Sequence, residues 1–161
     1  MSHSEIVDFS SANHIGEASA FLTANLTHVK RKIMQDAAKG GVAWNEEKCN
    51  RVERLYKRWM ICGEKYRADV RFVPTKDVDT FWHYHILHTK QYMDDCYRYF
   101  GRFIHHNPHL EETSEMCENR RQSRELFLRE VNQYSADELA DCVSCFGEPH
   151  PDDEGECSKC D

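Results

Sequence analysis

Long hydrophobic runs are the first thing that this sequence lacks. No apolar segment among its 161 residues approaches the roughly 20 residues that a membrane-spanning helix needs. The first residues also lack a basic stretch followed by an apolar core, so we expect no signal peptide, a cytoplasmic location and no membrane partner. In a reducing compartment, cysteine thiols are more often metal ligands than disulfide partners. The eight cysteines therefore direct attention to metal binding.

Recognised catalytic motifs and strand signals are lacking as well. The sequence contains no HExxH zinc motif, no glycine-rich phosphate loop and no nucleophile elbow. Strand signals are nearly absent, and the chain has no internal repeats. These absences favour a helical protein, and they leave open whether the protein is an enzyme.

Charge is distributed unevenly along the chain. Residues 137–161 contain nine acidic residues and one lysine, whereas residues 1–136 contain 19 acidic and 20 basic residues. An acidic tail repels phosphate groups, so we do not expect nucleic acid as a partner. The shift in composition predicts two parts, a helical body over residues 1–136 and a small acidic tail over residues 137–161.

Apolar residues spaced three and four apart predict an all-α fold, a compact bundle of about five helices. The pattern places them at about residues 13–39, 46–66, 77–87, 89–100 and 111–134. Asn45 is suited to cap the second helix, and Gly40-Gly41 and Gly101 are suited to end the first and the fourth. A capping box at Ser135 predicts one more short helix at the start of the tail.

Two CxxC pairs occupy the acidic tail. Eleven residues separate the pairs, and this spacing allows four thiolates to surround one ion tetrahedrally. So small and polar a segment needs a staple to be ordered, and structural zinc is the leading interpretation. The alternatives are a rubredoxin-like iron site, a redox-active CxxC, and a disordered tail with unligated thiols. The predicted zinc ligands are Cys142, Cys145, Cys157 and Cys160.

A histidine-rich stretch over residues 77–109 is the most informative part of the body. It contains six of the ten histidines, namely His83, His85, His88, His105, His106 and His109. Neutral imidazole and thiolate are the usual ligands of zinc and of several transition metals. At about 100° per residue, His83 and His85 point in different directions from one helix. A shared ion therefore requires a second contributor, either Cys96 or the loop that carries His105 and His106.

The same stretch resembles a known family. The run Trp82-His-Tyr-His-Ile-Leu87, then Tyr92, Asp95-Cys96, Phe100-Gly-Arg102 and His106, is similar to the motif of the glycine-rich domain-containing protein family. The resemblance covers about residues 70–109 and implies no settled activity. It keeps His83, His85, Cys96 and His106 as the positions that matter, together with Asp79, Trp82, Tyr92 and Asp95. His88, His105 and His109 fall outside the motif, and the four-cysteine tail has no counterpart in it.

These observations predict a second metal site in the body, formed by His83, His85, Cys96 and His106 and holding a second zinc, an iron or a copper ion. Asp79 is expected either to ligate the ion or, as we favour, to orient His83 as a hydrogen-bond acceptor. Candidates for moving protons in catalysis are Asp79, Tyr92 and Asp95. The competing interpretation is a packed polar core in which Cys96 is a small buried hydrophobe.

Three functions fit this sequence. The first is a metal-binding protein that acts as a metal-dependent hydrolase or oxidoreductase. The alternative is a non-catalytic adaptor module whose acidic, zinc-stapled tail docks a protein or peptide partner. The third is metal storage, delivery or sensing through exchangeable ligands. The substrate, the oligomeric state and the partner are not determined by the sequence.

Overall fold

The computed structural model describes residues 18–107 and 113–131, and within these ranges its regular elements are helices, with no strand. The prediction of an all-α fold is therefore confirmed. The elements in chain order are the 3-10 helix η1 (Ala20–Thr23), α2 (Thr27–Ile33), the 3-10 helix η2 (Ala37–Lys39), α3 (Glu46–Lys65), α4 (Lys76–Leu87), α5 (Thr89–Phe100) and α6 (Ser114–Val131). The four-cysteine tail, its predicted boundary at residue 137 and the short helix from Ser135 lie outside the described residues.

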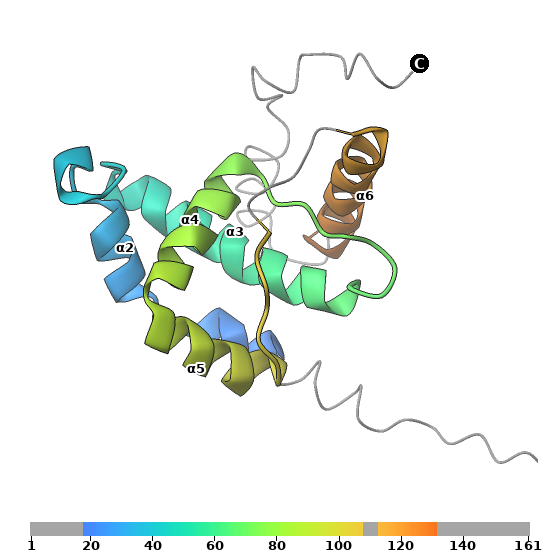
Figure 1. Cartoon of the computed structure of the whole chain (residues 1–161), viewed down its shortest axis with the longest axis horizontal. Coiled ribbons are helices and arrows are strands. Elements are labelled where there is room, and N and C mark those ends of the chain that lie inside the picture. The colour runs from blue at the N-terminus through green and yellow to red at the C-terminus, as the bar shows by residue number, and fades with distance from the viewer. Residues whose placement is uncertain (1–17, 108–112, 132–161) are drawn as a thin grey trace, which may run out of the picture.

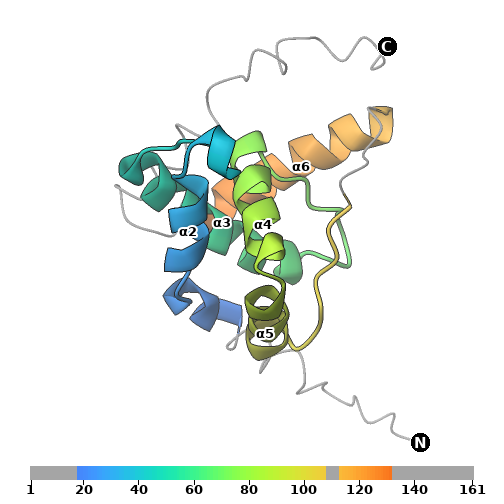
Figure 2. The same cartoon turned by 60° about the vertical axis from the view of Figure 1, so that its left-hand side comes forward.

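Helix α3 forms the centre of the arrangement (Figure 1). It packs against α2, α4, α6 and η1, while α5 packs against α4 and η1. Turning the molecule shows α2 and α4 side by side, with α5 continuing from the end of α4 (Figure 2). In the same view α6 lies behind α4 and packs against α3. Fully buried side chains between these helices include Phe21, Val52, Tyr56, Val78 and Phe81. The core therefore lies between α3, α4 and the N-terminal elements.

Local signals mark three helix ends, of which the sequence predicts those at Asn45 and Gly101 but not the cap at Thr75. The Asn45 side chain accepts a hydrogen bond from the Lys48 amide at 2.8 Å and so caps α3. Thr75 makes a longer cap to the Val78 amide, 3.4 Å, at the start of α4. Gly101 takes a left-handed φ of 68° at the end of α5, a conformation that glycine adopts without steric cost.

The prediction of one long helix over residues 13–39 is wrong for its described part. The chain leaves helical geometry at Ala24, whose ψ is 137°, and α2 begins only at Thr27. The buried Lys57 amine donates hydrogen bonds to the carbonyls of Leu22 (3.3 Å) and Ala24 (2.6 Å), so these groups are satisfied outside a helix. The apolar period continued through the break because η1 packs against α3 and α5 while α2 packs against α3 and α4. Periodicity alone does not register such a break.

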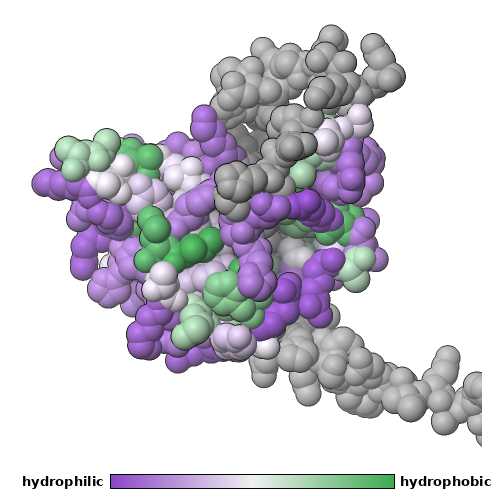
Figure 3. Space-filling view, viewed as in Figure 1, coloured by the Kyte–Doolittle hydropathy of each residue, from purple (hydrophilic) through white to green (hydrophobic). Residues whose placement is uncertain are grey.

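The surface is mostly hydrophilic on the face drawn in Figure 3, with separate apolar areas between charged residues. Large apolar side chains that remain exposed among the described residues are Leu22, Met34, Val42, Leu87, Met93 and Tyr97. Within the same ranges, no helix combines the length and apolar character required to cross a membrane.

Candidate metal site

Helix α4 presents two of the candidate residues on one side. Its N-terminus is fixed by Thr75, and its buried face is formed by Val78, Phe81, Trp82 and His85. Asp79 and His83 are four residues apart and therefore lie one above the other on a different, partly exposed face. Their side chains are 36% and 44% exposed. The amphipathic pattern of α4 thus places a carboxylate and an imidazole side by side at the surface.

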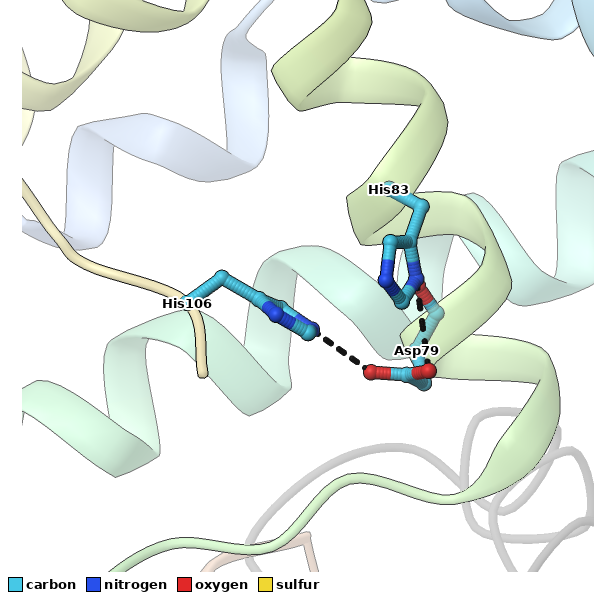
Figure 4. A group of neighbouring side chains, drawn as sticks. All are labelled: Asp79, His83 and His106. Atoms are coloured by element: carbon cyan, nitrogen blue, oxygen red, sulfur yellow. Dashed lines mark hydrogen bonds and ion pairs between the residues drawn. The ribbon is translucent and has the colours of Figure 1, made fainter. Parts of the chain in front are cut away.

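His106 reaches this pair from a different part of the chain. After α5 ends at Gly101, the chain turns back and runs in a non-helical segment, residues 103–107, past α3 towards the N-terminal half of α4 (Figure 1). The three side chains of Asp79, His83 and His106 point towards one another (Figure 4). The turn at Gly101 therefore brings together residues that are 27 positions apart in sequence.

The geometry of the group is tight. His106 Nε2 donates to Asp79 Oδ1 at 2.7 Å, and His83 Nδ1 donates to the Asp79 backbone carbonyl at 2.8 Å and lies 3.3 Å from Asp79 Oδ2. The two imidazole ring centres are 4.4 Å apart. One possible ligand atom from each of the three residues lies within 4.8 Å of the other two. We refer to Asp79, His83 and His106 as the His-Asp cluster.

This spacing can be compared with the requirements of a metal ion. Zinc binds imidazole nitrogen and carboxylate oxygen at about 2.0–2.2 Å, so two of its ligands lie at most about 4.3 Å apart. That limit applies to ligands on opposite sides of the ion, whereas the ligand atoms around a tetrahedral zinc ion lie about 3.4 Å apart. The separations in the cluster, which reach at most 4.8 Å, would therefore have to close by up to about 1.4 Å. In the neutral ring, donation from His83 Nδ1 to a backbone carbonyl selects the tautomer in which Nε2 carries the lone pair that a metal ligand uses.

One side of the cluster is closed by packing. Trp82 is buried, and its ring lies edge-on to His106 with the centres 4.3 Å apart. The His106 side chain is only 9% exposed, in contrast to Asp79 and His83. The arrangement therefore has an aromatic wall behind His106 and an open side over α4.

His85 does not join the cluster. It is 1% exposed, accepts a hydrogen bond from the Tyr56 hydroxyl at Nδ1 (2.8 Å) and donates from Nε2 to Asp95 Oδ2 (3.1 Å). Burial is the largest influence on its pKa, which lies below the ordinary histidine value despite the opposing effect of the Asp95 carboxylate. Both ring nitrogens have partners, so the structure separates His85 from the other predicted ligands and places it in a polar group inside the core.

Cys96 and Tyr92 are also buried away from the cluster. Tyr92 is 2% exposed, and its hydroxyl accepts from Trp82 Nε1 (2.9 Å) and donates to the Ile104 carbonyl (2.6 Å). Burial raises the pKa of both Tyr92 and Cys96 above their ordinary values. The thiol and the phenol are therefore protonated at neutral pH. Cys96 was predicted to be a metal ligand and Tyr92 to carry protons. In the structure both side chains instead contact the Ile104 backbone and core residues.

The remaining histidines occupy other places. His88 Nδ1 donates to the Tyr84 carbonyl at 2.8 Å, at the junction of α4 and α5. The His105 ring packs edge-on against Phe103 within the segment 103–107. His109, like the four tail cysteines, lies outside the described residues.

Two members of these polar groups were not found from the sequence in their structural roles. Asp79, expected mainly to orient His83, also accepts a hydrogen bond from His106 and so contacts both imidazoles of the cluster. Tyr56, which has no role assigned from the sequence, is the partner of His85. The i,i+4 spacing to His83 was a usable signal for Asp79. No local signal marks Tyr56, because its partner lies 29 residues away.

Fold and site together describe a small all-helical protein with a cluster of two imidazoles and a carboxylate on one helix and the segment that folds back beside it. The UCP032817-like family model matches residues 21–139, which is most of the chain, and the protein belongs to that family. The resemblance to the glycine-rich domain-containing family is thereby corrected: a short motif over residues 70–109 suggested it, whereas the match to the UCP032817-like family extends over the whole described body. No curated protein and no solved structure gives a significant match.

Proposed function

We propose that this protein binds a divalent transition-metal ion at the His-Asp cluster of Asp79, His83 and His106. The observation that carries the proposal is the convergence of three ligand-type side chains, from two separate parts of the chain, within 4.8 Å. The competing explanation is that the His106–Asp79 hydrogen bond merely fastens the segment 103–107 to α4. Metal binding explains in addition why the partly exposed His83 sits against the same carboxylate.

The donor set indicates which metals fit. Two imidazoles and one carboxylate suit zinc, which takes this set in hydrolytic sites, and ferrous iron, which takes it in oxygen-activating sites. Thiolate-preferring ions such as Cu(I) are disfavoured, since the predicted thiol ligand Cys96 faces Tyr92 and the Ile104 backbone. Zinc is our first choice, with iron as the redox-active alternative.

Three protein ligands leave coordination positions for water or substrate. The exposed flank of Asp79 and His83 is where such positions would lie. A metal ion there would lower the pKa of bound water and support hydrolysis, and iron would support oxidation. A metal-dependent hydrolase or oxidoreductase is therefore the class of enzyme that we propose for this site.

We further propose that the tail binds a structural zinc ion through Cys142, Cys145, Cys157 and Cys160. This proposal depends on the CxxC spacing alone, because these residues lie outside the described part of the chain. The two sites differ in ligand chemistry, so they can be tested separately.

Metal content of the full-length protein tests both proposals at once. We expect two ions per wild-type chain after purification and exposure to zinc, one fewer in the His83→Ala/His106→Ala variant, and one fewer in a Cys157→Ser/Cys160→Ser variant. Elemental analysis after gel filtration measures the ratio. Far-ultraviolet circular dichroism establishes that each variant remains helical.

A matched control uses His88 and His105, two histidines whose contacts lie elsewhere. Changing both to alanine should leave the metal ratio unaltered. Loss of the same ion in the control and in the cluster variant, or retention of the ion by the cluster variant, would remove the site from Asp79, His83 and His106.

A further inference from the structure

The Ile104 backbone is held by two residues of α5. Its carbonyl accepts the 2.6 Å hydrogen bond from the Tyr92 hydroxyl. Its backbone also forms a hydrogen bond with Cys96, which partly offsets the rise that burial causes in the pKa of the thiol. Tyr92 and Cys96 are four residues apart and so face the same side of their helix.

This double attachment lies two residues before His106. Because only one residue separates Ile104 from His106, fixing the Ile104 peptide limits where the His106 backbone can lie. The neighbouring Phe103 ring packs at a right angle on Tyr92, with the centres 5.4 Å apart. The segment 103–107 is therefore anchored just before His106, through the Phe103 side chain and the Ile104 backbone.

The Tyr92 hydroxyl also contacts Trp82, the aromatic side chain that packs behind His106. Trp82 Nε1 donates to the Tyr92 oxygen at 2.9 Å, and the Trp82 ring lies 4.3 Å from His106. Trp82 is the residue next to His83 on α4. One hydroxyl thus links the helix that carries Asp79 and His83 to the segment that carries His106.

We propose that Tyr92, assisted by Cys96, is the positioning residue of the His-Asp cluster: it sets where the His106 imidazole meets Asp79 and His83, and thereby the affinity of the site for metal. This inference rests on the proposed metal binding for its effect on affinity, and on geometry alone for its effect on His106. Cys96 was predicted to be a metal ligand and Tyr92 to carry protons. The inference gives both residues a different role, which is to position His106 through the Ile104 peptide.

The test compares two tyrosines that each lose one buried hydroxyl. Tyr92→Phe removes the link to Ile104, whereas Tyr56→Phe removes the bond to His85 and leaves the segment 103–107 untouched. Cobalt(II) titration of the full-length protein in a Cys157→Ser/Cys160→Ser background is the first readout. We expect Tyr92→Phe to weaken cobalt binding by about 10-fold or more, as is usual when a residue that orients a ligand is lost, and Tyr56→Phe to leave it unchanged.

A second readout needs no metal. Nuclear magnetic resonance of the His106 ring nitrogens in the metal-free protein reports its hydrogen bond to Asp79. We expect the ring signals to move towards those of a solvent-exposed histidine in Tyr92→Phe and to stay in place in Tyr56→Phe. Cys96→Ala, which keeps the hydroxyl, should produce a smaller change in the same direction and serves if Tyr92→Phe does not fold.

The outcomes separate the two proposals. If the Cys157→Ser/Cys160→Ser protein with an intact cluster binds cobalt no better than the same protein carrying His83→Ala and His106→Ala, the proposed metal site fails. The His106 signals of the protein with an intact cluster still decide the positioning role. If wild type binds cobalt through the cluster, but a folded Tyr92→Phe or Cys96→Ala binds it equally well and keeps the His106 signals, the positioning inference is overturned. Equal effects of Tyr56→Phe and Tyr92→Phe would also overturn it, since they would indicate a general loss of packing.

Discussion

Individual histidines in this protein behave in different ways because of their surroundings. His106 and His83 share the carboxylate of Asp79 near the surface, while His85 is enclosed between Tyr56 and Asp95. An enclosed imidazole with both nitrogens bonded contributes to the core, and a partly open one retains a nitrogen for a ligand. Proximity in sequence therefore says little about which histidines act together.

The burial of His85 predicts a pH dependence of stability. Burial lowers its folded-state pKa below the unfolded value of about 6.5, so the unfolded chain takes up the proton first as the pH falls. Stability from this group is fully present above pH of about 6.5 and is lost as the pH falls below it. We expect the free energy of unfolding, measured with urea, to decrease between pH 7.5 and 5.5.

His85→Gln is the matched variant for this prediction. A glutamine amide can accept from Tyr56 and donate to Asp95 without titrating, and ordinary carboxylates stay ionised over this pH interval. The decrease should therefore be smaller in the variant than in wild type. An identical pH dependence in both proteins would assign the effect to other groups.

At the scale of the elements, the turn after α5 matters most for the site. Gly101 has a φ of 68°, and from it the chain reverses into the segment that carries His106. A side chain at this position is strained by about 1 kcal/mol, because L residues disfavour the left-handed region. The end of one helix thus controls where a residue five positions later lies.

Gly101→Ala should therefore lower the free energy of unfolding by about 1 kcal/mol. Gly63→Ala is the opposite case: Gly63 lies inside α3, and an added Cβ would meet the Phe72 ring at 3.4 Å, an ordinary contact. We expect that variant to be neutral or stabilised by up to about 1 kcal/mol, since alanine is the better helix former. Urea unfolding of both variants measures the contrast, and similar losses in the two would contradict the backbone argument.

At the scale of the whole molecule, a metal ion at the cluster would join α4 to the segment 103–107 and so favour the folded state over the unfolded one. Binding to the folded state alone stabilises it by about 2.7 kcal/mol when the free ion is at 100 times its Kd. The cluster bridges residues 27 positions apart, so the unfolded chain does not present it. Metal addition is therefore expected to act on the stability of the entire body.

Zinc should accordingly raise the melting temperature of the full-length Cys157→Ser/Cys160→Ser variant. The same protein carrying His83→Ala and His106→Ala in addition should show no rise. Differential scanning calorimetry at a series of zinc concentrations measures the shift. A rise of equal size in both proteins would mean that zinc acts elsewhere on the chain.

Most helix positions were predictable because their signals are local. Asn45, Thr75 and Gly101 mark ends through short-range hydrogen bonds or backbone preference, and apolar spacing marks α3, α4 and α5. The break after Thr23 was missed because Lys57, 33 residues beyond Ala24, satisfies the carbonyls that it leaves. Helix ends that depend on distant partners have no local signature.

By itself the sequence determined the all-α fold, the bounds of the central helices and the divergence of His83 from His85, since each follows from torsional preference and the helical period within a few residues. Only the tertiary structure decided that His83 meets His106 and Asp79, that His85 is enclosed with Tyr56 and Asp95, and that Tyr92 and Cys96 hold the Ile104 peptide. Those contacts join separate elements, and their geometry depends on how α3, α4 and α5 pack and where the chain turns at Gly101. Packing of distant segments, not spacing along the chain, selects the residues of the candidate site.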